Sequence, residues 1–238
     1  VGICFIGERN LKDFLNKYPN SVNVDIVRDF LVKAYATNKD YKSTIEFLKG
    51  LPNLTLEQKY TMQRASFFDA IEFFNANEFE QSIERFDLSL SFPYSEELSA
   101  LAHFWKSESY FSLAQFEKAI SSYESFVYNP SSIEQKEYGD GYYGLAYSYY
   151  LNKDYTNSIN WFRKFVELES TDEKINDAFL RIGDNYFLTK NYRRALDFYE
   201  KAFEKNIFDN DYAIFQQVLC YGLTNQKNER KSKLNVLY

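Results

Sequence analysis

The chain has 238 residues and a net charge of −6, with 45% hydrophobic and 26% charged side chains. This composition suits a globular protein with a sizeable core. It offers no basic cluster dense enough to follow a phosphate backbone, and no apolar run long enough to span a membrane. Nucleic-acid binding and direct membrane insertion are therefore not expected. Only eight Gly and four Pro are present, which favours long helices joined by short turns.

The pattern of residues 1–21 indicates the second helix of a helical hairpin. Its apolar residues recur at spacings of three and four: Leu11, Phe14, Leu15 and Tyr18. Such spacing places them on one face of a helix, which Pro19 and Asn20 then end. We interpret 1–21 as a partial repeat.

Five similar segments follow, and a sixth begins. The five occupy 22–56, 57–96, 97–135, 136–172 and 173–208, and a partial repeat covers 209–238. Each full segment has a five-residue turn that closes on an aromatic residue: Tyr41, Phe79, Phe116, Tyr155 and Tyr192. These aromatics recur about every 38 residues, a period typical of helical repeats.

Two further columns keep the same register. Three residues after each closing aromatic stands a small side chain: Thr44, Ser82, Ala119, Ser158 and Ala195. Four residues later stands a large apolar one: Leu48, Phe86, Tyr123, Phe162 and Tyr199. Small residues near a turn let two antiparallel helices approach closely, while the large residues fill the space beside them. Each segment is therefore predicted to form an antiparallel helix pair.

This arrangement resembles the tetratricopeptide repeat. The best-matching residues are Leu145-Ala146, Tyr149, Tyr155, Ser158 and Phe162, and in the next segment Ile182-Gly183, Tyr186, Tyr192, Ala195, Tyr199 and Ala202. The resemblance implies an all-α fold, an α-solenoid of helix pairs in a right-handed superhelix. It also implies one array over residues 1–238 that binds a protein or peptide partner on its concave face. Partial repeats at both ends favour an internal portion of a longer array. Asp69 and Lys106 depart from the family pattern, which has apolar residues there.

A narrower resemblance concerns bacterial proteins of the cell envelope. The sequence from Phe14 to Ser21 is similar to repeat boundaries in outer-membrane assembly lipoproteins and Tol-associated periplasmic proteins. The run Phe104–Glu108 with Tyr110 resembles large repeat proteins of the Bacteroidetes. These likenesses favour a periplasmic or outer-membrane-associated location over a cytoplasmic one.

The sequence offers little for catalysis. Its single histidine, His103, lies in a predicted helix and is expected to be a packing residue. Cys4 and Cys220 belong to opposite ends of the array and are expected to stay unpaired. No nucleophile–base constellation and no metal-loop spacing is present. We therefore expect no enzymatic activity, no catalytic residue, no metal site and no cofactor.

The candidate binding residues lie in the first helices of three successive segments, where the family's concave surface is formed. They are Phe104, Glu108 and Phe111; Asp140, Tyr143, Tyr147 and Tyr150; and Asp177, Leu180, Asp184 and Phe187. The rings would supply contact area, and the carboxylates would orient basic or hydrogen-bonding groups of the partner. Tyr147 in particular is expected to be partly exposed, with Glu108 and Asp184 beside it.

Two other functions are compatible with the same residues. Tyr143, Tyr147 and Tyr150 could stack on sugar rings in a small-ligand or glycan-binding module of the cell envelope. The array could also be a structural spacer whose rings merely pack between helices.

Overall fold

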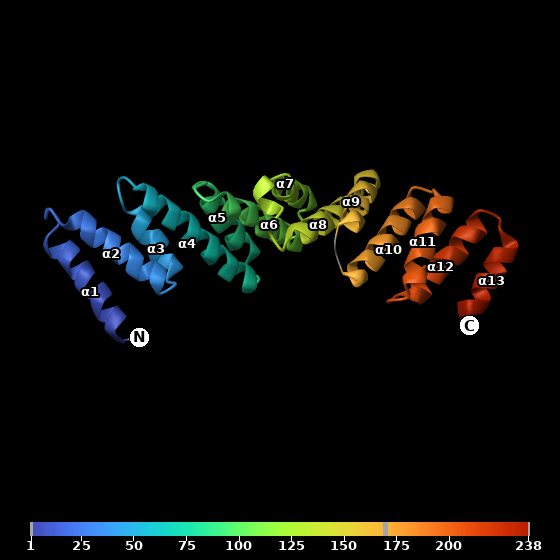
Figure 1. The fold of residues 1–238 in the computed structure, drawn as a ribbon, viewed down its shortest axis with the longest axis horizontal. Coiled ribbons are helices and arrows are strands. Elements are labelled where there is room, and N and C mark those ends of the chain that lie inside the picture. Colours follow the sequence, from blue (N-terminus) through green and yellow to red (C-terminus); the bar gives the residue numbers. More distant parts are fainter. Residues whose placement is uncertain (1, 169–170, 238) are drawn as a thin grey trace. The chain divides into compact units, whose positions relative to one another are not determined.

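The computed structural model describes the backbone of residues 2–168 and 171–237 (Figure 1). All regular structure in this part of the chain is helical, which confirms the predicted all-α fold class. The chain divides into two compact units, Val1–Leu113 and Ala114–Tyr238, which are described separately. The division falls within the segment 97–135.

The first unit contains six helices. They are α1 (Gly2–Lys17), α2 (Val24–Thr37), α3 (Tyr41–Lys49), α4 (Leu56–Asn75), α5 (Phe79–Leu90) and α6 (Glu96–Ser112). Consecutive helices run antiparallel and pack on one another (Figure 1). α2 also contacts α4, and α4 contacts α6. We call α2, α4 and α6 the first helices of their pairs, and they form one layer of this unit.

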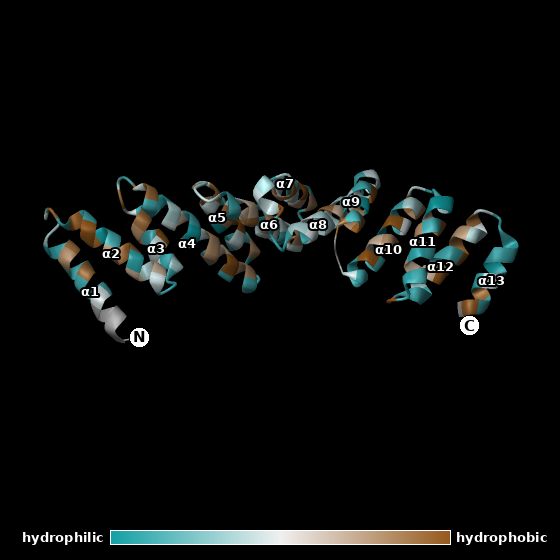
Figure 2. Cartoon of the chain, viewed as in Figure 1, coloured by the Kyte–Doolittle hydropathy of each residue, from teal (hydrophilic) through white to brown (hydrophobic). Residues whose placement is uncertain are grey.

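The second unit contains seven α-helices and a short 3-10 helix. They are α7 (Phe116–Val127), η1 (Pro130–Ser132), α8 (Tyr138–Leu151), α9 (Tyr155–Glu167), α10 (Asp172–Leu188), α11 (Tyr192–Lys205), α12 (Asn210–Leu223) and α13 (Lys227–Leu237). Each α-helix packs on the next. α8, α10 and α12 are the first helices here. Hydrophobic and hydrophilic residues interleave along the helices, as amphipathic packing requires (Figure 2).

The predicted turns form as expected. Each closing aromatic is the first residue of the second helix in its pair: Tyr41, Phe79, Phe116, Tyr155 and Tyr192. The third residue of every turn adopts a left-handed backbone conformation, with φ between 55° and 63°: Lys39, Asn77, Ala114, Lys153 and Lys190. In the α8–α9 turn the following N–H, from Asp154, donates to the carbonyl of Tyr149 at 2.9 Å. One left-handed residue thus ends each first helix and reverses the chain within three residues.

The five small residues that follow the closing aromatics lie inside the helix pairs. All five of these side chains are fully buried: Thr44, Ser82, Ala119, Ser158 and Ala195. The hydroxyl of Ser82 donates to the carbonyl of Ala70 at 2.9 Å, and that of Ser158 donates to Ala146 at the same distance. A second-helix side chain therefore reaches the backbone of the first helix directly.

Replacing one of these small side chains with a larger one should destabilise the protein. Ala195 occupies in α11 the position that Ser158 occupies in α9, so Ala195→Leu should overpack the pair and cost about 1–3 kcal/mol. Urea denaturation measures this cost. Ser131→Leu, in the 3-10 helix between pairs, is the control and should shift the midpoint little. Equal shifts for the two variants would show that the assigned register is wrong.

Two charged residues that depart from the repeat pattern are paired inside the first unit. The carboxylate of Asp69 in α4 accepts from Arg85 Nε in α5 at 2.5 Å. Lys106 in α6 donates to Asp87 in α5, also at 2.5 Å. The second helix thus supplies an opposite charge for each unusual first-helix residue, which limits the cost of burying it.

Of the two cysteines, the structure describes the side chain of Cys220. Cys220 lies fully buried in α12 and is not in a disulfide. Burial raises the pKa of its thiol to about 12, so the thiol stays protonated and poorly nucleophilic at neutral pH. The side chain of Cys4 lies outside the described part, so the expected absence of pairing stays a prediction.

Candidate functional site

A cluster of tyrosines on α8 is anchored to α10 through one carboxylate. The hydroxyls of Tyr143 and Tyr147 both donate to Asp177 Oδ2, at 2.8 Å and 2.5 Å. Their rings meet edge to face with centroids 4.9 Å apart. The tyrosines are one helical turn apart, so one side chain of the neighbouring first helix can fix both phenols.

Arg181 connects this carboxylate to a second one. Its Nε donates to Asp177 Oδ1 at 3.2 Å, and its Nη1 donates to Asp184 Oδ2 at 2.6 Å. Asp184 Oδ1 accepts in turn from Tyr199 at 2.9 Å and from Tyr212 at 2.7 Å. Two carboxylates and one guanidinium therefore tie together α8, α10, α11 and α12. We call Tyr143, Tyr147, Asp177, Arg181, Asp184, Tyr199 and Tyr212 the tyrosine–carboxylate network.

A glycine makes room for one member of the network. A Cβ at Gly183 would lie only 2.6 Å from the ring of Tyr199. Because Gly183 has no Cβ, the ring of Tyr199 lies directly against α10. The Tyr199 hydroxyl there donates to Asp184, the residue after Gly183. The match of Ile182-Gly183 to the family pattern therefore has a packing reason here.

The network is largely desolvated. The side chains of Asp184, Asp177 and Arg181 are 6%, 14% and 23% exposed. Burial raises the pKa of Asp184, against the lowering effect of Tyr212, Arg181 and Tyr199. Burial also raises the pKa of Tyr147, and its bond to Asp177 adds to this effect. The phenols thus remain protonated donors at neutral pH.

The three tyrosines of α8 that were predicted to bind a partner retain part of their surface. Tyr143, Tyr147 and Tyr150 are each partly buried, as expected for Tyr147. The Tyr147 ring also packs on Phe162 of α9, with centroids 5.2 Å apart. Its hydroxyl is already bonded within the protein, to Asp177. The arrangement offers aromatic surface held in fixed positions.

Three predicted groove residues prove to be interior. Leu180 is fully buried and Phe104 nearly so, so both belong to the core. Asp184 is also buried, and both of its oxygens accept hydrogen bonds from this chain. Asp177, Arg181 and Asp184 of α10 are joined through the Arg181 guanidinium. Leu180 has the same spacings of three and four from Asp177 and Asp184, yet its side chain is fully buried.

Four of the other predicted residues lie outside the network. Asp140 is an exposed partner of Lys174, and Phe187 is partly buried against Tyr192 with ring centroids 5.4 Å apart. Glu108 and Phe111 are partly buried on α6 in the first unit. The expected position of Glu108 beside Tyr147 joins two separate units and stays a prediction.

Sequence reasoning missed Arg181, Lys174 and Tyr212. The signal for Arg181 was present, since it stands four residues after Asp177 and three before Asp184, the spacing of helical ion pairs. Tyr212 reaches Asp184 from the next first helix. No local spacing indicates that contact.

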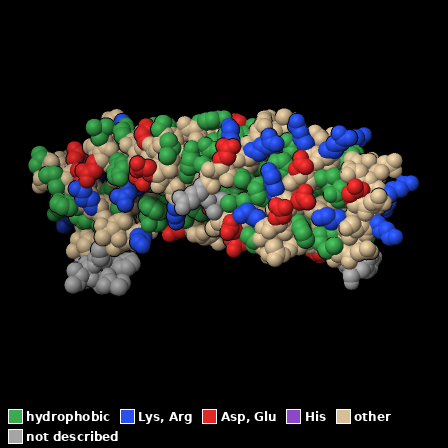
Figure 3. All heavy atoms as spheres, turned by 45° about the vertical axis from the view of Figure 1, so that its right-hand side comes forward, with side chains coloured by type: hydrophobic (Ala, Val, Ile, Leu, Met, Phe, Trp, Pro, Cys, Tyr) green, Lys and Arg blue, Asp and Glu red, His purple; other side chains and the backbone are tan. Residues whose placement is uncertain are grey.

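The described surface is chemically mixed. On the face drawn in Figure 3, acidic and basic side chains are interspersed with hydrophobic ones. Among the side chains that the structure describes, in residues 7–168 and 171–236, no group of three or more His, Cys, Asp and Glu could hold a metal ion. Over the same residues no helix has both the length and the apolar character needed to cross a membrane.

Comparison with known proteins identifies the repeat. Residues 139–172 and 177–206 match family models of the tetratricopeptide repeat. Both stretches lie in the second unit, and the second contains most of the network. No curated protein matches the sequence significantly.

Several solved structures share the fold. MamA is 16% identical with a TM-score of 0.60, over 73% of this chain and 87% of that one. YrrB, described as a tetratricopeptide-repeat protein with an unusual peptide-binding site, is 17% identical with a TM-score of 0.58, over 72% and 82%. PilF of Pseudomonas aeruginosa is 15% identical with a TM-score of 0.53, over 88% and 89%. These TM-scores show a common fold, and at identities this low the likeness extends to the fold alone.

Proposed function

We propose that this array of tetratricopeptide repeats is a scaffold that binds a protein or peptide along the layer of its first helices. The observation that carries the proposal is the row of partly exposed tyrosines on α8, two of which are fixed by Asp177. YrrB, which shares the fold, is described as having a peptide-binding site. That likeness supports the same class of function here.

The network prepares the tyrosines for binding. Tyr143 and Tyr147 cannot turn away from the surface without breaking bonds to Asp177. Fixing a side chain before association avoids an entropy cost of about 0.5–1.5 kcal/mol for each one immobilised. Tyrosine rings also contribute strongly at the centres of interfaces. A partner with apolar side chains and a few polar groups would match this surface.

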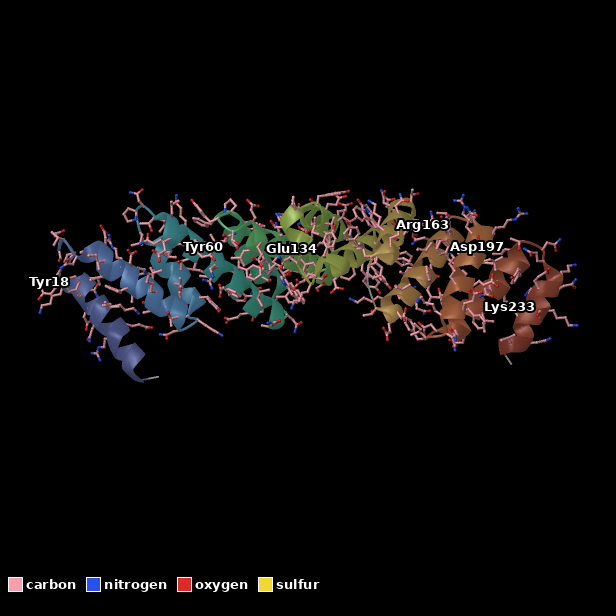
Figure 4. All side chains as sticks on the ribbon, viewed as in Figure 1. Tyr18, Tyr60, Glu134, Arg163, Asp197 and Lys233 are labelled. Carbon is pink, nitrogen blue, oxygen red and sulfur yellow. The ribbon has the colours of Figure 1, made fainter. Side chains whose placement is uncertain are left out.

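Photocrosslinking tests the proposal while an aromatic ring is kept at the substituted position. Benzoylphenylalanine replaces Tyr150, whose ring packs against Tyr147 and Tyr155 but which is not a member of the network. The tagged protein is then irradiated in a lysate of its own organism. Mass spectrometry should identify one or a few crosslinked proteins. The matched control places the same probe at Asp197, an exposed residue of α11 (Figure 4).

The comparison of the two positions decides the outcome. Capture from position 150 and not from 197 supports binding along the first helices. Equal capture from both positions, or none from either, would contradict it. Crosslinking to glycan rather than protein would favour the small-ligand alternative.

The location of the protein is proposed on sequence resemblance alone. The run from Phe14 to Ser21 is similar to repeat boundaries of bacterial cell-envelope proteins. The run Phe104–Glu108, with Tyr110, resembles large repeat proteins of the Bacteroidetes. We therefore propose a periplasmic or outer-membrane-associated scaffold. Fractionation of cells expressing the full-length protein tests this, and recovery in the cytosolic fraction would refute it.

A further inference from the structure

Three leucines form a row at the ends of the first helices in the second unit. Each is the last residue of its helix, α8, α10 or α12. They are Leu151, Leu188 and Leu223, with exposed fractions of 40%, 48% and 56%. Because consecutive helices run antiparallel, these helix ends and the turns that follow them lie along one edge of the unit (Figure 1). We call residues 151–158, 188–195 and 223–230 the turn edge.

The turn edge carries positive charge that the chain leaves unpaired. All its basic side chains are exposed, and within the described part of the chain none of them forms an ion pair. One of its two acids, Asp154, caps α9 by accepting from the Asn157 N–H at 3.2 Å. The turn edge is therefore basic in a chain whose net charge is −6. Its charged residues are the six cations Lys153, Lys190, Arg193, Arg194, Lys227 and Arg230 and the two acids Asp154 and Glu229.

The opposite edge of the same unit, where the first helices begin, carries acidic side chains. The first turn of α10 contains Asp172 and Glu173, and the first turn of α12 contains Asp211. Lys205, at the end of α11, pairs with Asp172 at 2.6 Å, so this cation is partly neutralised. Charge in the unit is thus divided between two edges. An anionic surface would attract the turn edge and repel the opposite one.

The first unit has neither the leucines nor the excess of cations at the corresponding positions. Its first helices α2 and α4 end in Thr37 and Asn75, which are polar. The turn after α4 leads into Glu78 and Glu80, and residues 75–82 contain no Lys or Arg. The helix pairs of both units follow the same repeat pattern. The row of leucines and the basic charge are therefore additions to that pattern, confined to the second unit.

Two of the cations lie against the ends of the helices that carry the leucines. The Arg194 guanidinium lies over the ring of Tyr186 in α10, 5.7 Å from its centroid. A Cβ at Gly222 would lie 3.5 Å from Arg230 Nε, so Arg230 lies against the last turn of α12. Apolar tips and charged groups therefore occur side by side. This combination suits the boundary of an anionic lipid layer, where both kinds of group contribute to binding.

We propose that the turn edge of the second unit docks on an anionic lipid surface. Its cations would contact the lipid phosphates, and its leucines would reach the boundary between head groups and acyl chains. A lipid surface is favoured over an acidic protein because the leucines recur once per helix pair along an edge, with cations at each turn. The chain would lie on the surface and would not cross it. This docking goes beyond the proposed scaffold function and uses no residue of the tyrosine–carboxylate network.

Co-sedimentation of the whole chain with lipid vesicles tests the proposal. One set of vesicles contains phosphatidylglycerol and phosphatidylcholine in equal parts, and the other contains phosphatidylcholine alone. The chain should bind the anionic vesicles, and added salt should weaken the binding. Lys190→Gln combined with Arg193→Gln should weaken it about twentyfold, because each cation near an anionic surface contributes roughly a factor of five. Leu188→Ser combined with Leu223→Ser should weaken it about fivefold through lost apolar contact.

The matched control is Lys136→Gln combined with Lys164→Gln, which removes two exposed cations of the same unit from outside the turn edge. It should change binding little, and urea midpoints should show that every variant is folded. If the leucine variant is destabilised, the two charge variants still decide the matter. Equal binding to neutral vesicles, equal losses for the two charge variants, or undiminished binding by a folded leucine variant would overturn the proposal. A chain that ignores anionic vesicles but binds polyglutamate through Lys190 and Arg193 would assign the turn edge to an acidic protein instead.

Discussion

The free energy of unfolding is expected to fall steeply once the pH rises above about 10, the ordinary pKa of tyrosine. Burial raises the pKa of Tyr143, Tyr147 and Tyr199 in the folded protein, and nearby carboxylates add to the shift. The folded state therefore keeps phenolic protons that the unfolded chain releases. Stability is unaffected by these groups below pH 10 and is lost as the pH rises toward their folded pKa values.

The slope of the unfolding free energy against pH depends on how many phenols have a raised pKa in the folded protein. Each buried phenol contributes about 1.4 kcal/mol per pH unit above 10. Urea denaturation between pH 8 and about 11.5, followed by circular dichroism and by tyrosinate absorbance, measures the slope. Tyr199→Phe should reduce the slope by one proton.

Tyr128→Phe is the matched control, because this ring is 67% exposed and lies outside the network. It should leave the slope unchanged. Equal slopes for wild type and Tyr199→Phe, or an unfolding midpoint that does not move up to pH 11, would contradict a network of buried phenols. The same titration reports on the candidate site, since Tyr143 and Tyr147 belong to both.

The helix pairs could be predicted because each repeat has the same pattern of residue types at the same short spacings. A closing aromatic, a small residue three positions later and a large apolar residue four beyond that form one stripe on a second helix. Ser158 shows why the stripe matters, since its hydroxyl reaches the backbone of Ala146. Such features depend on contacts within one pair, which short sequence spacings describe well.

The candidate site was predictable only in part, because exposure depends on how successive first helices face one another. Leu180 and Arg181 are adjacent in sequence, yet one is fully buried and the other lies in the network. One residue turns a helix by about 100°, so an error of one position moves a side chain to a different face. Asp184 was expected at the surface, but Tyr199 and Tyr212 reach it from other helices.

The pocket lined by Lys33, Lys39 and Arg64 in the first unit also could be predicted only in part. Lys33, Ala36 and Arg64 occupy positions equivalent to residues of the network, and the sequence makes that equivalence visible. Whether a small residue such as Ala36 leaves a cavity depends on what the neighbouring helix places there. The structure supplies that information through the lining of the pocket.

Removal of Arg181 should cost about 3–5 kcal/mol, because it leaves two buried carboxylates without their cation. The guanidinium bonds both Asp177 and Asp184, whose side chains are almost entirely withdrawn from water. Arg181→Ala should therefore lower the urea midpoint strongly at pH 7. The comparison is Lys205→Ala, which removes a 2.6 Å pair with the exposed Asp172 and should cost less than about 1 kcal/mol.

A second substitution separates lost charge compensation from lost packing. Asp184→Asn in the Arg181→Ala background removes the uncompensated charge while its amide oxygen can still accept from Tyr199 and Tyr212. The double variant should be more stable than Arg181→Ala alone, because a neutral amide is cheaper to bury than an unpaired carboxylate. A double variant that is less stable, by the sum of two independent losses, would mean that the Arg181 stem matters through packing. In that case the carboxylates would not depend on Arg181 for charge compensation, and the tyrosine hydroxyls that donate to them would be sufficient.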